Sequence, residues 1–179
     1  METMVRAVRL LAMTVWVGGI VFFAFVLAPT VFSPAIVERM HGVALSGAIV
    51  GTALGKLNAM GLGCGAIFVA ATVVLFRRAR MAVRGRYEAQ ILLAVLMLAG
   101  TAYLRWNVIP AMERDRAMAG GDMEAAARDS YARLDFDRLH ARSEHVEGFV
   151  LLCGLAVVFL MARESVGIET DAAEALDAA

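Results

Sequence analysis

The stretch LLAMTVWVGGIVFFAFVLAPTVFSPAIV, residues 10–37, contains no acidic or basic side chain. A bilayer core is about 30 Å thick, and about 20 helical residues are needed to cross it. Lipid offers the backbone no hydrogen-bond partner, so a segment that is apolar on every face has to satisfy its own backbone groups as a helix. The stretch therefore predicts a membrane-spanning helix.

Three further charge-free stretches follow, over residues 57–76, 89–104 and 148–162. The chain is 60% hydrophobic, and none of these stretches shows the alternation of apolar and polar residues that is typical of membrane barrels. We therefore expect an all-α fold, an integral membrane four-helix bundle. The expected segments are spans near residues 10–32, 57–76, 88–109 and 140–162 within a domain of residues 1–163, followed by a short acidic cytoplasmic tail over 164–179.

The arginines predict the orientation, because short cytoplasmic loops of membrane proteins carry an excess of Lys and Arg. Arg6 and Arg9 precede the first span, and Arg163 follows the fourth. Five more arginines crowd the link between the second and third spans: Arg77, Arg78, Arg80, Arg84 and Arg86. With four spans all of these arginines lie on one side, so we expect a multi-pass protein of the inner membrane with both termini in the cytoplasm.

A further apolar segment, Met40 to Gly55, is separated from the second span by little more than Lys56. Two antiparallel spans cannot reverse in so few residues, so we expect an additional outer-leaflet helix, either interfacial or packed on the bundle. It carries Gly47, Gly51 and Gly55 on one helical face, and small residues at this spacing let another backbone approach closely. We expect this face to pack on the bundle or to hold a homo-oligomer or a helix partner.

Ionisable side chains near the outer ends of the spans form a candidate polar cluster. A charge at the centre of a membrane helix costs at least ~2.5–3.5 kcal/mol, so such groups need partners. The expected members are Lys56 beside Asn58, Arg105, His140, Ser143, Glu144 and Glu147. The simplest interpretation is structural, with Arg105 paired to Glu144 or Glu147.

Two alternatives give the same residues a ligand. A His and a carboxylate four residues apart can share a metal ion, so His140 is the only candidate for a metal or haem ligand. A path for a proton or a small solute is the second alternative. The chain has none of the common nucleophile, phosphate-binding or zinc-protease motifs, so no catalytic residue is predicted and a non-enzymatic role is favoured. Its 17 basic and 17 acidic residues form no basic domain that indicates nucleic acid.

Three motifs together resemble the transmembrane protein 205-like family, over residues 5–162. The first is in the opening span, the second is a Pro-x-Met at the end of the third span, and the third opens the last span. The matching residues are Trp16, Gly18, Gly19, Phe22, Pro29, Phe32, Pro110, Met112, Phe136, His140 and Ser143. That family often has Asn four residues after the motif serine, where this chain has Glu147.

The resemblance implies a four-helix membrane protein without an established reaction. The family's architecture is similar to that of the copper-resistance D membrane proteins and of four-helix protoporphyrinogen oxidases, which use a membrane-buried histidine around haem. We expect a small membrane protein whose outer polar cluster binds or passes a small solute or a metal ion. The alternatives are a haem-binding redox protein using His140, and a structural or assembly partner in a membrane complex.

Overall fold

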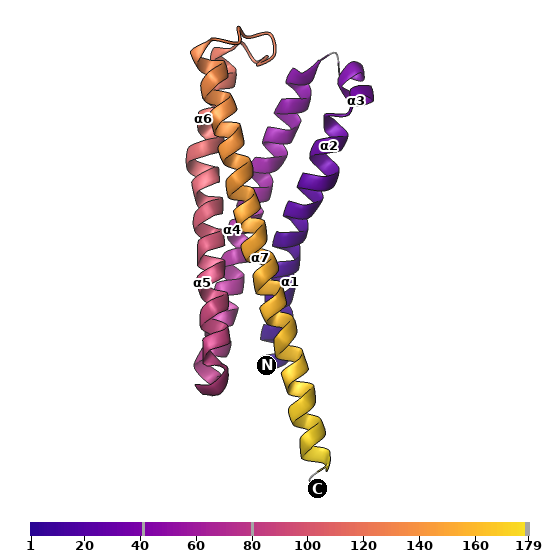
Figure 1. Ribbon diagram of the computed structural model, residues 1–179, viewed down its shortest axis with the longest axis vertical. Coiled ribbons are helices and arrows are strands. Elements are labelled where there is room, and N and C mark those ends of the chain that lie inside the picture. Colours follow the sequence, from indigo (N-terminus) through magenta and orange to yellow (C-terminus); the bar gives the residue numbers. More distant parts are fainter. Residues whose placement is uncertain (41, 80, 178–179) are drawn as a thin grey trace.

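The computed structural model describes residues 1–40, 42–79 and 81–177, of which residue 82 and residues 165–177 are described by their backbone alone (Figure 1). The described residues form helices and short connections, with no strand among them. The elements are α1 Glu2–Phe22, η1 Phe23–Leu27, α2 Ala28–Val31, α3 Pro34–Arg39, α4 Val43–Arg78, α5 Met81–Tyr103, η2 Leu104–Val108, α6 Ile109–Met118 and α7 Tyr131–Asp177. The segments η1 and η2 are π-helical turns that leave the helices on either side continuous.

Four helical stretches among the described residues are long and apolar enough to cross a membrane: Glu2–Val31, Val43–Arg78, Val83–Met118 and Tyr131–Glu164. The predicted all-α membrane fold is therefore confirmed. Each stretch exceeds the predicted span, because its helix continues through the polar flanks that the sequence analysis left outside. The residues of the predicted tail up to Asp177 continue α7, and residues 178–179 lie outside the described part of the chain.

The additional outer helix that was expected over residues 40–55 to feed the second span is continuous with that span. Helix α4 begins at Val43 and runs without interruption for 36 residues, which at 1.5 Å per residue is about 54 Å. The break lies before it, at Gly42, whose φ of +135° is a conformation that favours glycine. Between Gly42 and Arg78 no proline interrupts the helix, so the apolar segment and the second span join as one helix.

The core lies around the indole of Trp16, in the half of the bundle that holds the amino terminus and the link between α4 and α5 (Figure 1). We call this half the inner half and the opposite one the outer half. A side chain added at Gly65 of α4 would place its Cβ 2.5 Å from the Trp16 ring, and Gly61 one turn earlier is covered by the same ring. Phe68 and Met97 are fully buried beside it. Glycines at positions 61 and 65 therefore let α1 and α4 approach until the indole fills the space between them.

The other contacts between helices in this half are also made by side chains that pack closely onto glycines. A Cβ at Gly100 of α5 would lie 2.9 Å from Val150 of α7, and one at Gly154 of α7 would lie 2.6 Å from Val17 of α1. Towards the outer end, α1–α2 and α4 lean away from α6 and the adjoining part of α7, as Figure 1 shows. The bundle is thus tightly packed on the inner side and divides into two halves on the outer side.

A buried set of polar side chains, the inner polar cluster of Arg9, Gln90 and Glu164, joins α1, α5 and α7. Arg9 is 3% exposed, and its guanidinium donates to Gln90 Oε1 at 3.0 Å and to Glu164 Oε2 at 2.6 Å. The Gln90 amide donates to the other oxygen of Glu164. The rings of Tyr87 and Phe68 lie 5.5 Å and 6.0 Å from the guanidinium. The sequence analysis used Arg9 only as an orientation signal, but its charge is paired inside the bundle.

Gly65→Ala is expected to lower the melting temperature of the protein in mild detergent. The added methyl group meets the Trp16 ring, and overpacking a close-packed contact costs about 1–3 kcal/mol, more than the ~0.5–1 kcal/mol that alanine gains over glycine in a helix. Gly63→Ala is the matched control on the same helix, because nothing lies within 4 Å of a Cβ at Gly63. Equal melting temperatures for both variants would contradict the Trp16 packing.

Glu164→Met is expected to destabilise the bundle by about 3 kcal/mol or more, because it leaves Arg9 buried without its carboxylate. Arg9→Met combined with Glu164→Met should cost less than Glu164→Met alone. The measurement is a double-mutant cycle on unfolding in detergent. The exposed pair Arg6–Glu2, at 2.8 Å on the same helix α1, is the control and should couple by less than about 1 kcal/mol. Additive losses at Arg9 and Glu164 would contradict the pairing.

Candidate functional site

A cavity of about 660 Å³ lies in the outer part of the bundle, where its two halves diverge. One wall comes from residues 20–32 of α1, η1 and α2 and from residues 43–54 of α4. The other wall comes from α6, the loop after it and residues 133–151 of α7. The lining is mostly apolar, with phenylalanines at positions 23, 25, 32 and 136. The cavity thus lies on the outer side of the Trp16 core, between segments that are distant in sequence.

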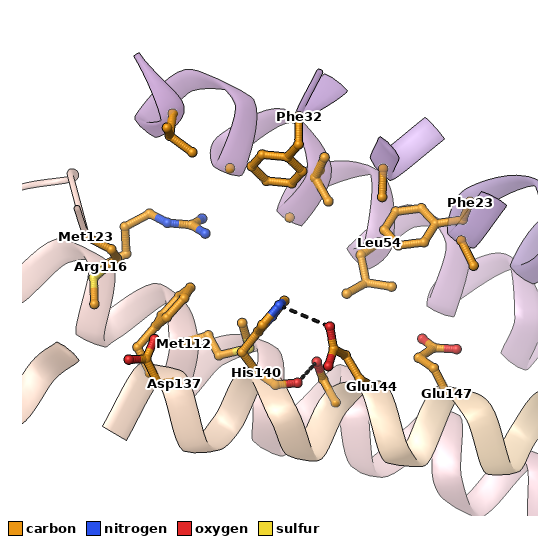
Figure 2. A pocket seen from close by; sticks show the side chains of 18 of the residues that line it. Phe23, Phe32, Leu54, Met112, Arg116, Met123, Asp137, His140, Glu144 and Glu147 are labelled. Atoms are coloured by element: carbon orange, nitrogen blue, oxygen red, sulfur yellow. Dashed lines mark hydrogen bonds and ion pairs between the residues drawn. The ribbon is translucent and has the colours of Figure 1, made fainter. Parts of the chain in front are cut away.

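The local geometry of the helices determines which residues face the cavity. The π-helical turn over 23–27 adds a residue to one turn of the first span, and such turns are frequent at functional sites. Pro29 follows in the first turn of α2, where a proline is tolerated because the missing N–H bond is compensated locally. On α7, residues 136, 140, 144 and 147 recur every three or four positions and so share one face. That face looks into the cavity, as Figure 2 shows for His140, Glu144 and Glu147.

The middle of the α7 wall is an aromatic and polar row. The rings of Phe136 and His140 stack with centroids 6.1 Å apart and planes 9° apart. His140 Nε2 lies 3.3 Å from Glu144 Oε1, and both side chains are more than half exposed. Ser143 is buried and its hydroxyl donates to the His140 carbonyl at 2.7 Å. The exposed members of this row are therefore His140 and Glu144, whereas Ser143 is turned into the bundle.

The inner end of the cavity is formed by Glu147, opposite Leu54 and Phe23 (Figure 2). The Oε1 atom of its carboxyl is buried and has no hydrogen-bond partner among the described residues. Asn58 on α4 is also buried, and its Nδ2 has no partner either. The Asn58 amide lies near the Glu147 carboxyl without forming a hydrogen bond with it. The cavity therefore ends on a carboxyl group whose hydrogen-bonding capacity is unused.

Arg116 of α6 lies at the outer end of the cavity, on the side where Figure 2 also shows Asp137 and Met123. Its guanidinium carbon is 5.5 Å from the centre of the Phe136 ring. Its terminal nitrogens point at α4, 3.4 Å and 3.3 Å from the places that a Cβ would take at Gly47 and Gly51. The long Arg116 side chain thus crosses the mouth of the cavity from one half of the bundle to the other.

The predicted polar cluster is only partly brought together. His140, Ser143, Glu144 and Glu147 line the cavity, but Lys56 and Arg105 do not. Lys56 is exposed and lies two positions before Asn58, which is about 200° around an α-helix. Because Asn58 faces inwards, Lys56 has to face away. Depth alone, on which the prediction rested, does not determine which way a side chain points.

The predicted ion pair of Arg105 with Glu144 or Glu147 is not formed among the described residues. Glu144 pairs with His140, and Glu147 has no partner. Arg105 lies in the π-helical turn η2, next to Leu104, which together with Val108 faces the bundle interior. The residue following an inward-facing position is turned away from it by about 100° in a helix.

The glycine face predicted as a packing surface lines the cavity instead. Gly47 and Gly51 face the Arg116 side chain, and nothing lies within 4 Å of a Cβ at Gly55. The contacts between helices of this chain are made by other glycines, at positions 19, 61, 65, 100 and 154. A homo-oligomer or a helix partner at the face of Gly47, Gly51 and Gly55 stays a prediction.

The metal-ion alternative is weakly matched by this geometry, whereas haem binding at His140 stays a prediction. Among the described residues no group of three or more His, Cys, Asp or Glu side chains is close enough to hold a metal ion. His140 and Glu144 supply two ligands at most, whereas zinc sites in proteins use three or four protein ligands. The exposed His140 ring is also stacked on Phe136 rather than free to turn towards a ligand.

Residues from all three sequence motifs gather at the cavity. Those that line it are Pro29, Phe32, Met112, Phe136, His140 and Ser143. Trp16 and Gly19 belong to the packed core, nothing lies within 4 Å of a Cβ at Gly18, and Phe22 is exposed. The sequence analysis missed Arg116 and the role of Asn58. The recurrence of Phe136, His140 and Glu144 every four residues was a usable signal for the wall, whereas nothing in the sequence singles out Arg116.

Comparison with known proteins places the chain in a family but adds no activity. No match is found among curated proteins or among solved structures. A family model matches residues 11–119, which include most of α1 and all of α4 to α6 and end before α7. The resemblance to the transmembrane protein 205-like family stays a prediction. Since the matched residues make up more than half of the chain, the protein belongs to the family described as a domain of unknown function, DUF4149.

Proposed function

We propose that this integral membrane protein binds a small, mostly apolar molecule in the outer cavity, with a hydrogen-bond donor of that molecule placed at Glu147. The observation that carries the proposal is the Glu147 carboxyl at the inner end of the cavity, whose Oε1 atom is buried without a hydrogen-bond partner among the described residues. A buried acceptor without a donor costs about 1–3 kcal/mol. A ligand that brings a donor to this place recovers that free energy.

The dimensions and lining of the cavity support a ligand of this kind. Its volume of about 660 Å³ is within the range of ~300–1,000 Å³ that is common for small-molecule sites. Such sites combine apolar walls with a few polar groups that fix the orientation of the ligand. Here the walls are aromatic and aliphatic, and Glu147 is the polar group at the inner end of the lining, with the buried Asn58 near it.

The packing below the cavity supports binding rather than passage in this conformation. Trp16, Phe68, Met97, Val150 and Val157 are almost completely buried in the core, and none of them lines the cavity. Side chains of a packed core leave few voids larger than a water molecule, so this core favours a site that holds a solute over a path through the bundle.

We also propose that the cavity opens to the outer face of the inner membrane and that both termini are cytoplasmic. The arginine-rich link between α4 and α5 supports this orientation under the positive-inside rule. The loop between α6 and α7, at the same end as the cavity, carries three acids, Asp122, Glu124 and Asp129, against one base, Arg128.

Cysteine labelling tests the orientation. In a background without Cys64 and Cys153, Ala127→Cys in the loop after α6 and Met81→Cys at the start of α5 both introduce exposed thiols. A membrane-impermeant thiol reagent applied to intact cells is expected to label Ala127→Cys, and Met81→Cys only after permeabilisation. Labelling of Met81→Cys in intact cells would reverse the orientation.

Binding of two matched neutral probes tests the site. 1-Naphthylmethanol carries a donor and its methyl ether does not, so the alcohol is expected to bind about tenfold more tightly, which corresponds to ~1.4 kcal/mol. The measurement is calorimetry on protein in nanodiscs, with empty nanodiscs subtracted. Glu147→Leu should abolish the preference, while Glu113→Leu, an exposed acid of α6 that does not line the cavity, should keep it. Equal affinity of both probes for the unmodified protein would contradict the role of Glu147.

A further inference from the structure

We infer that the natural occupant of the cavity is an organic cation, an ammonium group on an apolar body, whose charge lies at Glu147. The inference rests on the proposed function and adds the charge of the ligand. A hydrogen-bond donor at Glu147 could be neutral or positive, and the distribution of charge along the cavity distinguishes between the two.

The inner part of the cavity carries negative side chains alone. Glu144 and Glu147 line it on α7. The opposing wall, over residues 20–32 and 43–54, contributes no charged side chain to the described lining. The two arginines that line the cavity, Arg116 and Arg133, belong to its outer part. A ligand that reaches Glu147 therefore meets carboxyl groups without a lysine or an arginine beside them.

Neither arginine compensates Glu147. Arg133 Nε lies 3.4 Å from Asp137 Oδ2, and the guanidinium also donates to the Met123 carbonyl. Its charge is therefore paired at the outer end of the cavity. Arg116 stands over Phe136, and Phe136 is eleven positions before Glu147 on α7, a rise of about 16 Å. No ion pair joins Arg116 to Glu147 among the described residues.

An ionised carboxyl at this depth needs a nearby positive charge. Taking a carboxylate out of water without a partner costs several kcal/mol, and charged groups inside membrane proteins are almost always paired. Asn58 offers only a neutral amide. A bound ammonium group supplies the opposite charge and a donor at once, so it matches Glu147 better than a neutral donor does.

The aromatic walls favour the same class of ligand. Cations are attracted to the faces of aromatic rings within about 6 Å of the ring centre. Phe23 and Phe32 line the wall opposite α7 (Figure 2). On α7, the Arg116 guanidinium already lies 5.5 Å from the Phe136 ring. The protein's own cation at the mouth shows that this wall accepts a positive group.

Arg116 then acts as a specificity-determining residue. Its positive charge crosses the mouth between Phe136 and the glycines at 47 and 51, where it repels an entering cation and attracts an entering anion. Removing this charge should therefore change the affinities for cations and anions in opposite directions.

Three probes with one apolar body test the charge: 1-naphthylmethylammonium, neutral 1-naphthylmethanol and anionic 1-naphthylacetate. Affinities are measured by calorimetry with the full chain in phosphatidylcholine nanodiscs, and empty nanodiscs are subtracted. The unmodified protein is expected to bind the ammonium at least tenfold more tightly than the alcohol and the acetate least. This ranking requires no variant and so does not depend on the folding of one.

Two variants locate the charge. Glu147→Gln keeps a hydrogen-bond acceptor but removes the charge. It should therefore lower the affinity for the ammonium at least tenfold and change the affinity for the alcohol by no more than about threefold. Arg116→Met should raise the affinity for the ammonium about threefold and lower the affinity for the acetate about threefold. Arg116 is half-buried and lies away from the packed core, so this variant reports on selectivity even if Glu147→Gln folds poorly. Glu113→Gln is the control for loss of an acid outside the cavity.

The outcomes separate the two proposals. Equal binding of ammonium and alcohol to the unmodified protein, with no effect of Glu147→Gln on the ammonium, would overturn the cationic ligand but keep the binding site. Tighter binding of the acetate would also overturn it. Failure of all three probes to bind would overturn the proposed function and this inference with it.

Discussion

The packing of the Trp16 indole against Gly61 and Gly65 is the contact on which the rest of the structure depends. It brings α1 and α4 together in the inner half of the bundle, and Phe68 and Met97 fill the space around it. Lipid-facing surfaces gain little from burial, so helices in a membrane associate where small residues permit close packing. Outside this contact the same helices are free to diverge, and the cavity occupies the space between them.

The inner polar cluster closes the end of the bundle opposite the cavity. Arg9, Gln90 and Glu164 connect three helices that the Trp16 contact alone does not join. Breaking a buried ion pair by removing one partner is costly because it leaves a charge in an apolar environment. The cluster and the core therefore act together: the core excludes water from the middle of the bundle, and the cluster holds the inner helix ends around it.

The spans could be predicted from the sequence because length and hydrophobicity alone determine them: three charge-free stretches lie inside membrane-length helices, and the first lies in one up to Val31. The direction in which individual side chains point could not be predicted in the same way. Lys56 and Glu147 were both expected in the outer half of the bundle, yet Lys56 faces outwards and Glu147 faces the cavity. A single position turns a side chain by about 100°, and the π-helical turn at η2 shifts Arg105 further.

The shape and the charge of the cavity have separate origins in the sequence. Its shape follows from backbone features: the glycines of the core, the π-helical turn η1 and the uninterrupted helix α4. The charge at its inner end comes from Glu144 and Glu147. The transmembrane protein 205-like family, to which the resemblance stays a prediction, often has Asn at the position of Glu147. An Asn there would present a neutral amide to Asn58, and two amides can satisfy each other. A carboxyl at the same place accepts hydrogen bonds but, when ionised, donates none and carries an uncompensated charge. The same fold would therefore hold a neutral ligand with Asn and a cationic one with Glu.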